Sequence, residues 1–332
     1  MIKHTKKLLT QVLKIAFSAG IIYWLVSSGK LNFAALRALL SPGPAALALS
    51  LVLFNLFFAS ERWRVLIRTQ NLDAEAWPVF KLSLIGIFFN FAMPGGVGGD
   101  VIKAYYFARQ YPGSKVVAIT SVLMDRILGL FAMVLMALFV MIYDMNHITH
   151  IKSLMTLFWF ILALTIAFVI GFALVFSSQI YKTRVLFKLF SKIPLSEKLI
   201  KLYESMHLYG KQRNRIAWVI LLSLLAQICA VVFLYLVGLM AGFSDISAKT
   251  YFLVAPLGFM ATAIPISPAG VGVGQAAFYF LFNIYTGKTS EVGPTTITAF
   301  QVGTFIVSLL GAFFYLRFKE TGTKGVEQFT KA

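Results

Sequence analysis

Acidic residues are scarce in this sequence, and cysteine is almost absent. Twelve Asp and Glu stand against thirty Lys and Arg, which gives a formal net charge of +18. The single cysteine, Cys229, excludes an internal disulfide framework and a cysteine-based metal site. Of four scattered histidines only His147 and His150 lie close together, and we expect both to be solvated in a short outer loop. We therefore expect no metal and no cofactor.

Long polar stretches are also missing, which excludes a sizeable soluble domain. Hydrophobic residues make up 59% of the chain and charged residues 13%, and the mean hydropathy is +0.82. Such a composition is typical of a polytopic membrane protein. We predict an all-α integral membrane protein in which residues 1–332 form a single membrane domain.

Six apolar runs are long enough to cross a bilayer as helices. The first follows a basic N-terminus, as in a signal peptide, but it is about as long as a full span, so we interpret it as an uncleaved helix. The six predicted spans are residues 9–28, 44–61, 117–143, 153–177, 216–241 and 295–317.

Lys and Arg gather in alternate loops, and this bias predicts the orientation. With the N-terminus inside, the basic clusters after the second span, between residues 182 and 215, and after residue 316 all fall on the cytoplasmic side. Both termini are therefore predicted to be cytoplasmic. A basic membrane protein attracts anionic lipid head groups, so we expect lipid partners and no nucleic acid.

The segment 179–215 alternates apolar and basic residues. This pattern favours an amphipathic helix on the inner leaflet, and the alternative is a solvated connector. It separates a first half, residues 1–178, from a second half, residues 216–320.

Each half contains an apolar segment that glycine and proline interrupt: 79–110, with its break at 90–103, and 250–286, with its break at 264–275. We expect helical hairpins that enter the membrane and return, or pairs of short helices around a break. Pro94, Gly96, Val97 and Gly98 recur as Pro268, Gly270, Val271 and Gly272, each 174 residues later. Opposed broken helices in two halves are typical of transporters with an inverted repeat.

The two breaks differ in charge. Asp100 and Lys103 follow the first set of glycines, whereas Gly274 and Ala277 occupy the corresponding positions of the second. We expect the first half to carry the charged chemistry and the second to supply a hinge or wall. The hinge residues are Pro94, Pro268, Gly270, Gly272, Gly274 and Gln275.

Ionisable residues inside membrane helices indicate a functional site. Arginine, lysine and the freed amides of a glycine break are suited to a phosphate head group. The alternative is that Asp125 with Arg126, and Glu61 with Arg64, are ion pairs that hold helices together, and that the glycines serve tight packing. The predicted substrate-binding residues are Asn90, Gly96, Gly98, Gly99, Asp100, Lys103, Glu61, Arg62, Arg64, Asp125 and Arg126.

The runs NFAMPGGVGGDVIKAYYFAR, SVLMDRILGL, SERWRVLIR and SPAGVGVGQAAFYF resemble the lysylphosphatidylglycerol synthase transmembrane-region family over nearly the whole chain. Asn90, Gly95, Gly96, Gly98, Gly99 and Asp100 match its first motif, and Asp125 and Arg126 its second. The resemblance implies lipid translocation. The family's membrane region is found in bacterial multiple peptide resistance factors, in which the substrate is aminoacylated phosphatidylglycerol. Those proteins add an aminoacyltransferase domain, and this chain ends in a short basic tail, so we expect no lipid synthesis.

The hypothesis is a flippase or transporter that moves an anionic or modified phospholipid across the bacterial inner membrane. It is not expected to be an enzyme. Two alternatives stay open: a membrane transferase with Asp100 or Asp125 as base or metal ligand, and a non-transporting partner of a separate lipid-modifying enzyme. Formation of a homo-oligomer is also left open.

Overall fold

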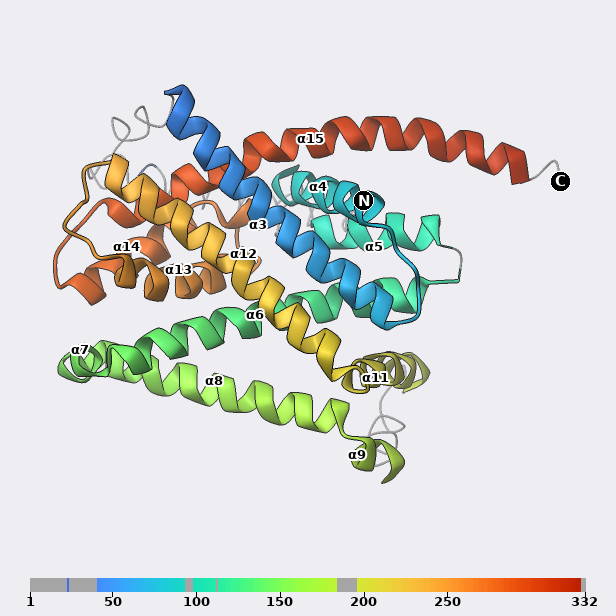
Figure 1. Ribbon diagram of the computed structural model, residues 1–332, viewed down its shortest axis with the longest axis horizontal. Coiled ribbons are helices and arrows are strands. Elements are labelled where there is room, and N and C mark those ends of the chain that lie inside the picture. The colour runs from blue at the N-terminus through green and yellow to red at the C-terminus, as the bar shows by residue number, and fades with distance from the viewer. Residues whose placement is uncertain (1–22, 24–40, 93–97, 112, 184–195, 330–332) are drawn as a thin grey trace, which may run out of the picture.

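The computed structural model describes residue 23 and residues 41–92, 98–111, 113–183 and 196–329. All regular secondary structure in these residues is helical (Figure 1). The helices are α3 (Pro42–Thr69), α4 (Ala76–Ala92), α5 (Gly98–Gln110), α6 (Lys115–Tyr143), α7 (Met145–His150), α8 (Lys152–Phe176), α9 (Ser178–Thr183), α11 (Ser196–Gly210), α12 (Arg213–Met240), α13 (Ala248–Thr262), the 3-10 turn η1 (Pro268–Gly270), α14 (Val273–Thr286) and α15 (Val292–Phe329).

Five helices are long and apolar enough to cross a membrane, which makes this a multi-pass membrane protein. They are α3, α6, α8, α12 and the Val292–Arg317 part of α15. These helices coincide with five of the six predicted spans. The sixth, residues 9–28, lies outside the described residues apart from Tyr23.

Both interrupted segments consist of two short helices. The pair α4 and α5 has 17 and 13 residues, and the pair α13 and α14 has 15 and 14. Each helix is shorter than the roughly 20 residues that a perpendicular span needs. In the first break, residues 93–97 lie outside the described residues, and they include Pro94, Gly95 and Gly96. The second break runs through η1.

Two sets of four helices follow one another in the same order, α3 to α6 and α12 to α15. The starts of corresponding helices are 171 to 177 residues apart. Their contacts also correspond, since α4 packs against α15 while α13 packs against α6, and each short pair packs on itself. Helices α3 and α12 lie side by side and run in opposite directions (Figure 1).

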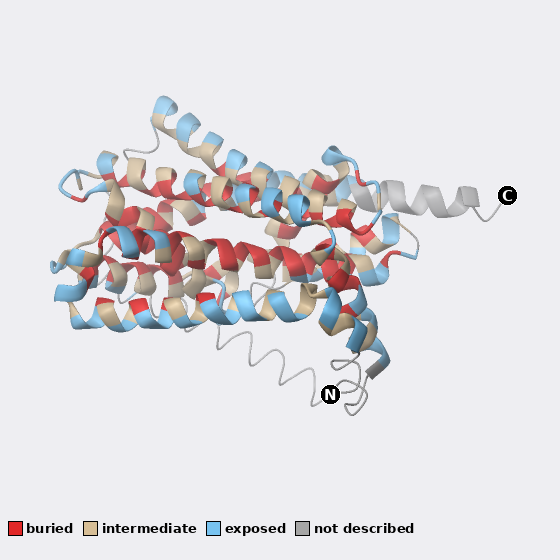
Figure 2. Cartoon of the chain, turned by 60° about the horizontal axis from the view of Figure 1, so that its bottom comes forward, coloured by how far each residue is buried: buried red, intermediate tan, exposed pale blue. Residues whose placement is uncertain are grey.

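Buried residues gather along the centre of this eight-helix body (Figure 2). The largest apolar cluster joins α3, α4, α6, α8 and α12 to α15. Helix α8 contacts this body mainly through α6, and it exposes large apolar side chains such as Trp159 and Phe160 outward.

The segment between the halves is only partly described. Residues 184–195 lie outside the description, and α11 packs against α8 and α6. Its buried residues are Tyr203, Ser205, His207 and Tyr209. Gln70 at the end of α3 donates a hydrogen bond to the Ser205 carbonyl at 2.6 Å. Helix α11 is therefore anchored to the end of α3 and packed on α6 and α8.

Candidate functional site

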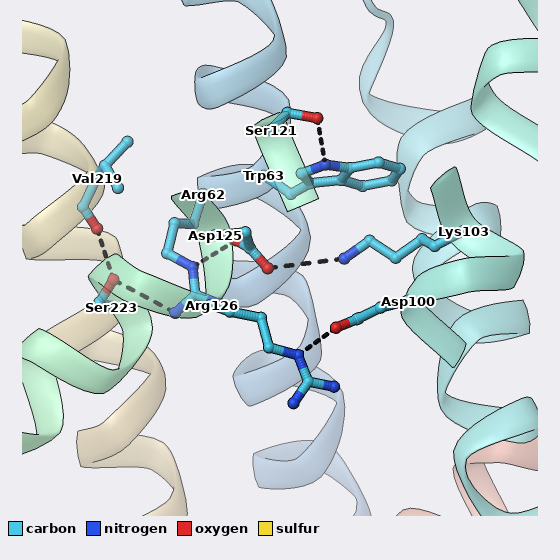
Figure 3. Close-up of polar contacts among 9 residues, drawn as sticks. All are labelled: Arg62, Trp63, Asp100, Lys103, Ser121, Asp125, Arg126, Val219 and Ser223. Atoms are coloured by element: carbon cyan, nitrogen blue, oxygen red, sulfur yellow. Dashed lines mark hydrogen bonds and ion pairs between the residues drawn. The ribbon is translucent and has the colours of Figure 1, made fainter. Parts of the chain in front are cut away.

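A charged cluster lies where α3, α5 and α6 meet. The Arg62 Nε donates to Asp125 Oδ1 at 2.7 Å, and Lys103 Nζ lies 3.7 Å from Asp125 Oδ2. The three side chains are only 10% to 12% exposed. Charges so deeply placed are tolerated because they are paired. Asp125 thus joins three helices (Figure 3).

Uncharged side chains also contact Arg62 and Lys103, the two cations that face Asp125. Lys103 Nζ lies 4.1 Å above the centre of the Trp63 ring, which favours its charge further. The Trp63 indole N–H donates to Ser121 Oγ at 3.1 Å. Arg62 donates a longer bond, 3.4 Å, to Ser223 Oγ of α12. At Gly129 an added Cβ would stand 2.8 Å from the Arg62 guanidinium, so glycine makes room for that group.

A second pair, Arg126 with Asp100, joins α6 to the first turn of α5. The Arg126 Nε donates to Asp100 Oδ2 (Figure 3). Asp100 also lies at the helix N-terminus, where the partial positive charge of the backbone favours a carboxylate. The Arg126 side chain is 38% exposed, far more than those of the first cluster. Arg126 is therefore the cation of this region that a ligand can approach.

Close backbone contact holds α4 against α5. A Cβ on Gly99 would collide with the Gly86 carbonyl and stand 2.6 Å from Asn90 Oδ1. The Asn90 Oδ1 accepts the Gly99 N–H at 3.0 Å. This bond satisfies one of the backbone donors that a helix N-terminus leaves free. Asn90 and Gly99 therefore define the geometry of the first break.

Glutamine side chains organise the second break. Gln275 Oε1 accepts the Gly272 N–H at 2.7 Å, and its Nε2 donates to Gln301 Oε1 at the same distance. Gly270 and Gly272 have φ of 70° and 85°, a left-handed conformation that glycine adopts readily. Gly274 packs against Thr262 and α15. The described part of this break contains no charge, as the sequence indicates.

A cavity of about 250 Å³ lies between the two breaks. Asn90 and Arg126 line it from the first half, and Gly270 and Gln301 from the second. The remaining wall is apolar or carries hydroxyl groups: Ile87, Phe91, Phe259, Thr262, Ala263, Ala269, Ile297, Phe300 and Thr304. The tertiary structure thus brings residues of both interrupted segments to one space.

Some predicted site residues lie elsewhere. Glu61 and Arg64 form a pair with each other on α3, at 2.5 Å. That pair lies within one helix, so it does not hold two helices together. Asp125 pairs with Arg62 rather than with its neighbour Arg126, because consecutive residues of a helix point about 100° apart. The other predicted positions fall at the two breaks: Gly98 begins α5 and Pro268 begins η1.

The opposite end of the molecule holds a polar cluster that the sequence analysis missed. Asp144 accepts hydrogen bonds from Lys249 Nζ at 2.7 Å and from the Tyr285 hydroxyl. Burial raises the pKa of Asp144, but these two bonds and the nearby charges outweigh burial and leave the pKa below its ordinary value. His147 Nε2 lies 2.9 Å from the Tyr285 carbonyl oxygen, so the expectation that it is merely solvated was wrong. His150 is exposed.

Other contributors that the sequence did not indicate are Trp63, Ser121, Ser223, Gln301 and the hydroxyl groups of Thr262 and Thr304. They are ordinary residues of apolar helices, and no motif distinguishes them. Within the described ranges, no group of three His, Cys, Asp or Glu residues is arranged to hold a metal ion.

Known membrane proteins are similar to this chain over nearly its whole length. A UPF0104 membrane protein of Methanocaldococcus jannaschii is 22% identical over 326 residues, covering 93% of this chain and 94% of that protein. Another from Methanothermobacter thermautotrophicus is 23% identical over 329 residues, with the same coverage. No solved structure matches significantly. The family model described as the lysylphosphatidylglycerol synthase TM region matches residues 11–311. By that match, this chain belongs to the lysylphosphatidylglycerol synthase TM-region family.

Proposed function

We propose that this protein is a transporter that moves an anionic or modified phospholipid between the two leaflets of a membrane. The observation that carries the proposal is the cavity that both interrupted segments line, with Arg126 on its wall. Transport sites of membrane proteins commonly lie where two broken helices meet.

The chemistry of the cavity suits a lipid head group. A charged group in hydrocarbon costs several kcal/mol unless it is paired or hydrated. Arg126 supplies a guanidinium for a phosphate, and Asn90 and Gln301 add amide donors. The acyl chains would stay in the bilayer while the head group passes through the cavity.

We further propose that α3 to α6 and α12 to α15 are inverted repeats that rock against each other around this cavity. The matching order of helices, their separation by 171 to 177 residues and their corresponding contacts support this. So do the opposite directions of α3 and α12 (Figure 1). In such a mechanism the short pairs α4 with α5 and α13 with α14 would be re-entrant hairpins.

The proposed orientation places both termini in the cytoplasm of a bacterial cell, with the protein in the inner membrane. The end of α3, the end of α8 and the start of α12 lie at the same end of the molecule (Figure 1). Arg68, Arg213 and Arg215 belong to that end. An excess of Arg and Lys on one side supports a cytoplasmic assignment for it.

The proposal is tested with the full chain in liposomes that contain fluorescently labelled phosphatidylglycerol. We expect the protein to expose inner-leaflet label to an added quencher much faster than protein-free liposomes, and Asp100→Asn to slow this at least tenfold. Asp73→Asn, which changes an exposed carboxylate, is the matched control. No movement of any anionic lipid by the wild type, with Asp100→Asn indistinguishable from it, would refute the proposal.

We propose that the protein acts without chemical change to the lipid. Mass spectrometry of the lipids after incubation tests this, since a covalently altered lipid would favour a transferase instead. Co-purification with a lipid-modifying enzyme, combined with no transport by the purified chain, would favour a non-transporting partner.

A further inference from the structure

We infer that the head group recognised in the cavity between the two breaks is anionic and carries no amine, so that an aminoacylated lipid is a poor ligand. This inference rests on the proposed function, because it assigns the substrate class of the same cavity. It concerns the charge of the head group.

The charge of the cavity wall is the first argument. Among the described residues, Arg126 is the one charged side chain that lines the cavity, and the polar remainder consists of amides, hydroxyls and backbone groups. No carboxylate of the described residues lines it. Together with the paired residues around it, this wall has one positive charge in excess, because Arg62, Lys103 and Arg126 face only Asp100 and Asp125.

The sequence supplies no further carboxylate to the cavity from the segments outside the description. Residues 1–40, 93–97 and 184–195 contain no Asp or Glu. Ten of the twelve acidic residues lie between positions 61 and 291 and are all described, and none lines the cavity. The remaining two, Glu320 and Glu327, follow the part of α15 that is apolar enough to span.

The carboxylates of Asp100 and Asp125 already have partners. Asp100 accepts from Arg126, and Asp125 from Arg62 with Lys103 close by. Recruiting Asp125 for a ligand ammonium would leave the buried Arg62 and Lys103 without their partner, which is strongly unfavourable. Recruiting Asp100 would break its ion pair with Arg126. A phosphate, by contrast, is attracted by the Arg126 guanidinium, which is 38% exposed and lines the cavity.

The charge of the ligand is the second argument. A lysyl ester adds two ammonium groups to the phosphoglycerol head group, and these are positively charged at neutral pH. Such a cationic head group therefore fits poorly beside the guanidinium of Arg126.

Native mass spectrometry of the purified full chain tests the inference directly. The protein is offered equal amounts of phosphatidylglycerol, lysyl-phosphatidylglycerol and phosphatidylethanolamine. We expect phosphatidylglycerol adducts to exceed lysyl-phosphatidylglycerol adducts at least tenfold. Equal retention, or a preference for the lysyl lipid, would overturn the inference.

A charge-adding variant provides the converse test. Thr304 lines the cavity, and its hydroxyl donates to the Phe300 carbonyl at 2.7 Å. Thr304→Asp should shift the retention ratio at least tenfold toward the lysyl lipid, and Gln301→Glu is a second variant with the same expectation. In the matched control Thr156→Asp, the threonine lies on the exposed face of α8 and bonds its own helix in the same way. An unchanged ratio in both cavity variants would contradict the assignment of this cavity.

The transport assay separates this inference from the proposed function. If phosphatidylglycerol is retained selectively but no lipid moves between leaflets, the proposed function fails and the ligand class stands. If both lipids are moved and retained equally well, the transporter stands and the inferred ligand class fails.

Discussion

Asp125 is the residue on which the charged cluster depends, because it faces two cations. Removing its charge leaves Arg62 and Lys103, both about nine-tenths buried, without a compensating carboxylate. Loss of one partner from a buried pair typically costs about 3–5 kcal/mol.

We therefore expect Asp125→Asn to lower the free energy of unfolding by about 3–5 kcal/mol. Thermal or denaturant unfolding in detergent measures this change. Asp73→Asn is the control, since its pair with Arg68 has side chains 90% and 41% exposed and such pairs contribute about 1 kcal/mol or less. Equal stability of the two variants would show that the buried pairing is not needed.

The lowered pKa of Asp144, at the end of the molecule opposite the charged cluster, predicts that the stability of the fold depends on pH. Burial alone would raise its pKa, but Lys249, Tyr285 and the nearby His147 leave the pKa below its ordinary value. A carboxylate with a lowered pKa in the folded state stabilises the fold above its unfolded pKa, about 3.9, and loses this contribution as the pH falls through the folded value.

The wild type should accordingly melt at a higher temperature than Asp144→Asn at neutral pH, and the difference should shrink below pH about 4. Melting temperatures across the pH range measure it. Asp245→Asn, in the same region but exposed, should change little at any pH. A difference that stays constant as the pH falls would contradict the assigned cause.

The pairing of α4 with α5 depends on the absence of a side chain at Gly99. A methyl group there overlaps the Gly86 carbonyl, which is backbone and has little freedom to move. Overpacking of this kind commonly costs about 1–3 kcal/mol.

Gly99→Ala should therefore destabilise the protein by about 1–3 kcal/mol or more and reduce lipid movement, because it spreads the first break. Gly171→Ala is the matched control, since nothing lies within 4 Å of a Cβ there and alanine favours a helix. Melting temperature and the liposome assay report both effects. A Gly99→Ala protein as stable and active as Gly171→Ala would show that the close approach is dispensable.

At the scale of the whole molecule, we expect the helix set α3 to α6 to move against the set α12 to α15 during transport. Asn90 of α4 and Thr262 of α13 line the same cavity from opposite sets. Because Cys229 is the one natural cysteine, its replacement gives a background for engineered pairs.

A flexible crosslinker between cysteines at positions 90 and 262 should stop lipid movement in the liposome assay, and cleavage of the linker should restore it. A matched pair within one set, at positions 259 and 304, should leave movement largely unchanged, because those residues move together. Full activity with the first pair crosslinked would exclude rocking around the cavity.

Composition and local pattern were sufficient to predict the coarse architecture. Apolar runs of span length predicted the five described long helices, because a bilayer requires about 20 apolar residues for each. Glycine and proline predicted both breaks, and the recurrence of Pro94 to Gly98 174 residues later anticipated the spacing of the two helix sets. These features are local, so they can be read directly from the chain.

Only the tertiary structure decided which residues far apart in the sequence pair with each other. Asp125 pairs with Arg62, 63 positions away, and Arg126 pairs with Asp100, while Glu61 and Arg64 stay with each other. Which charges meet depends on how helices rotate and pack, and one residue along a helix changes the direction by about 100°. The cavity between the breaks and the cluster around Asp144 arise in the same way, from segments that only packing brings together.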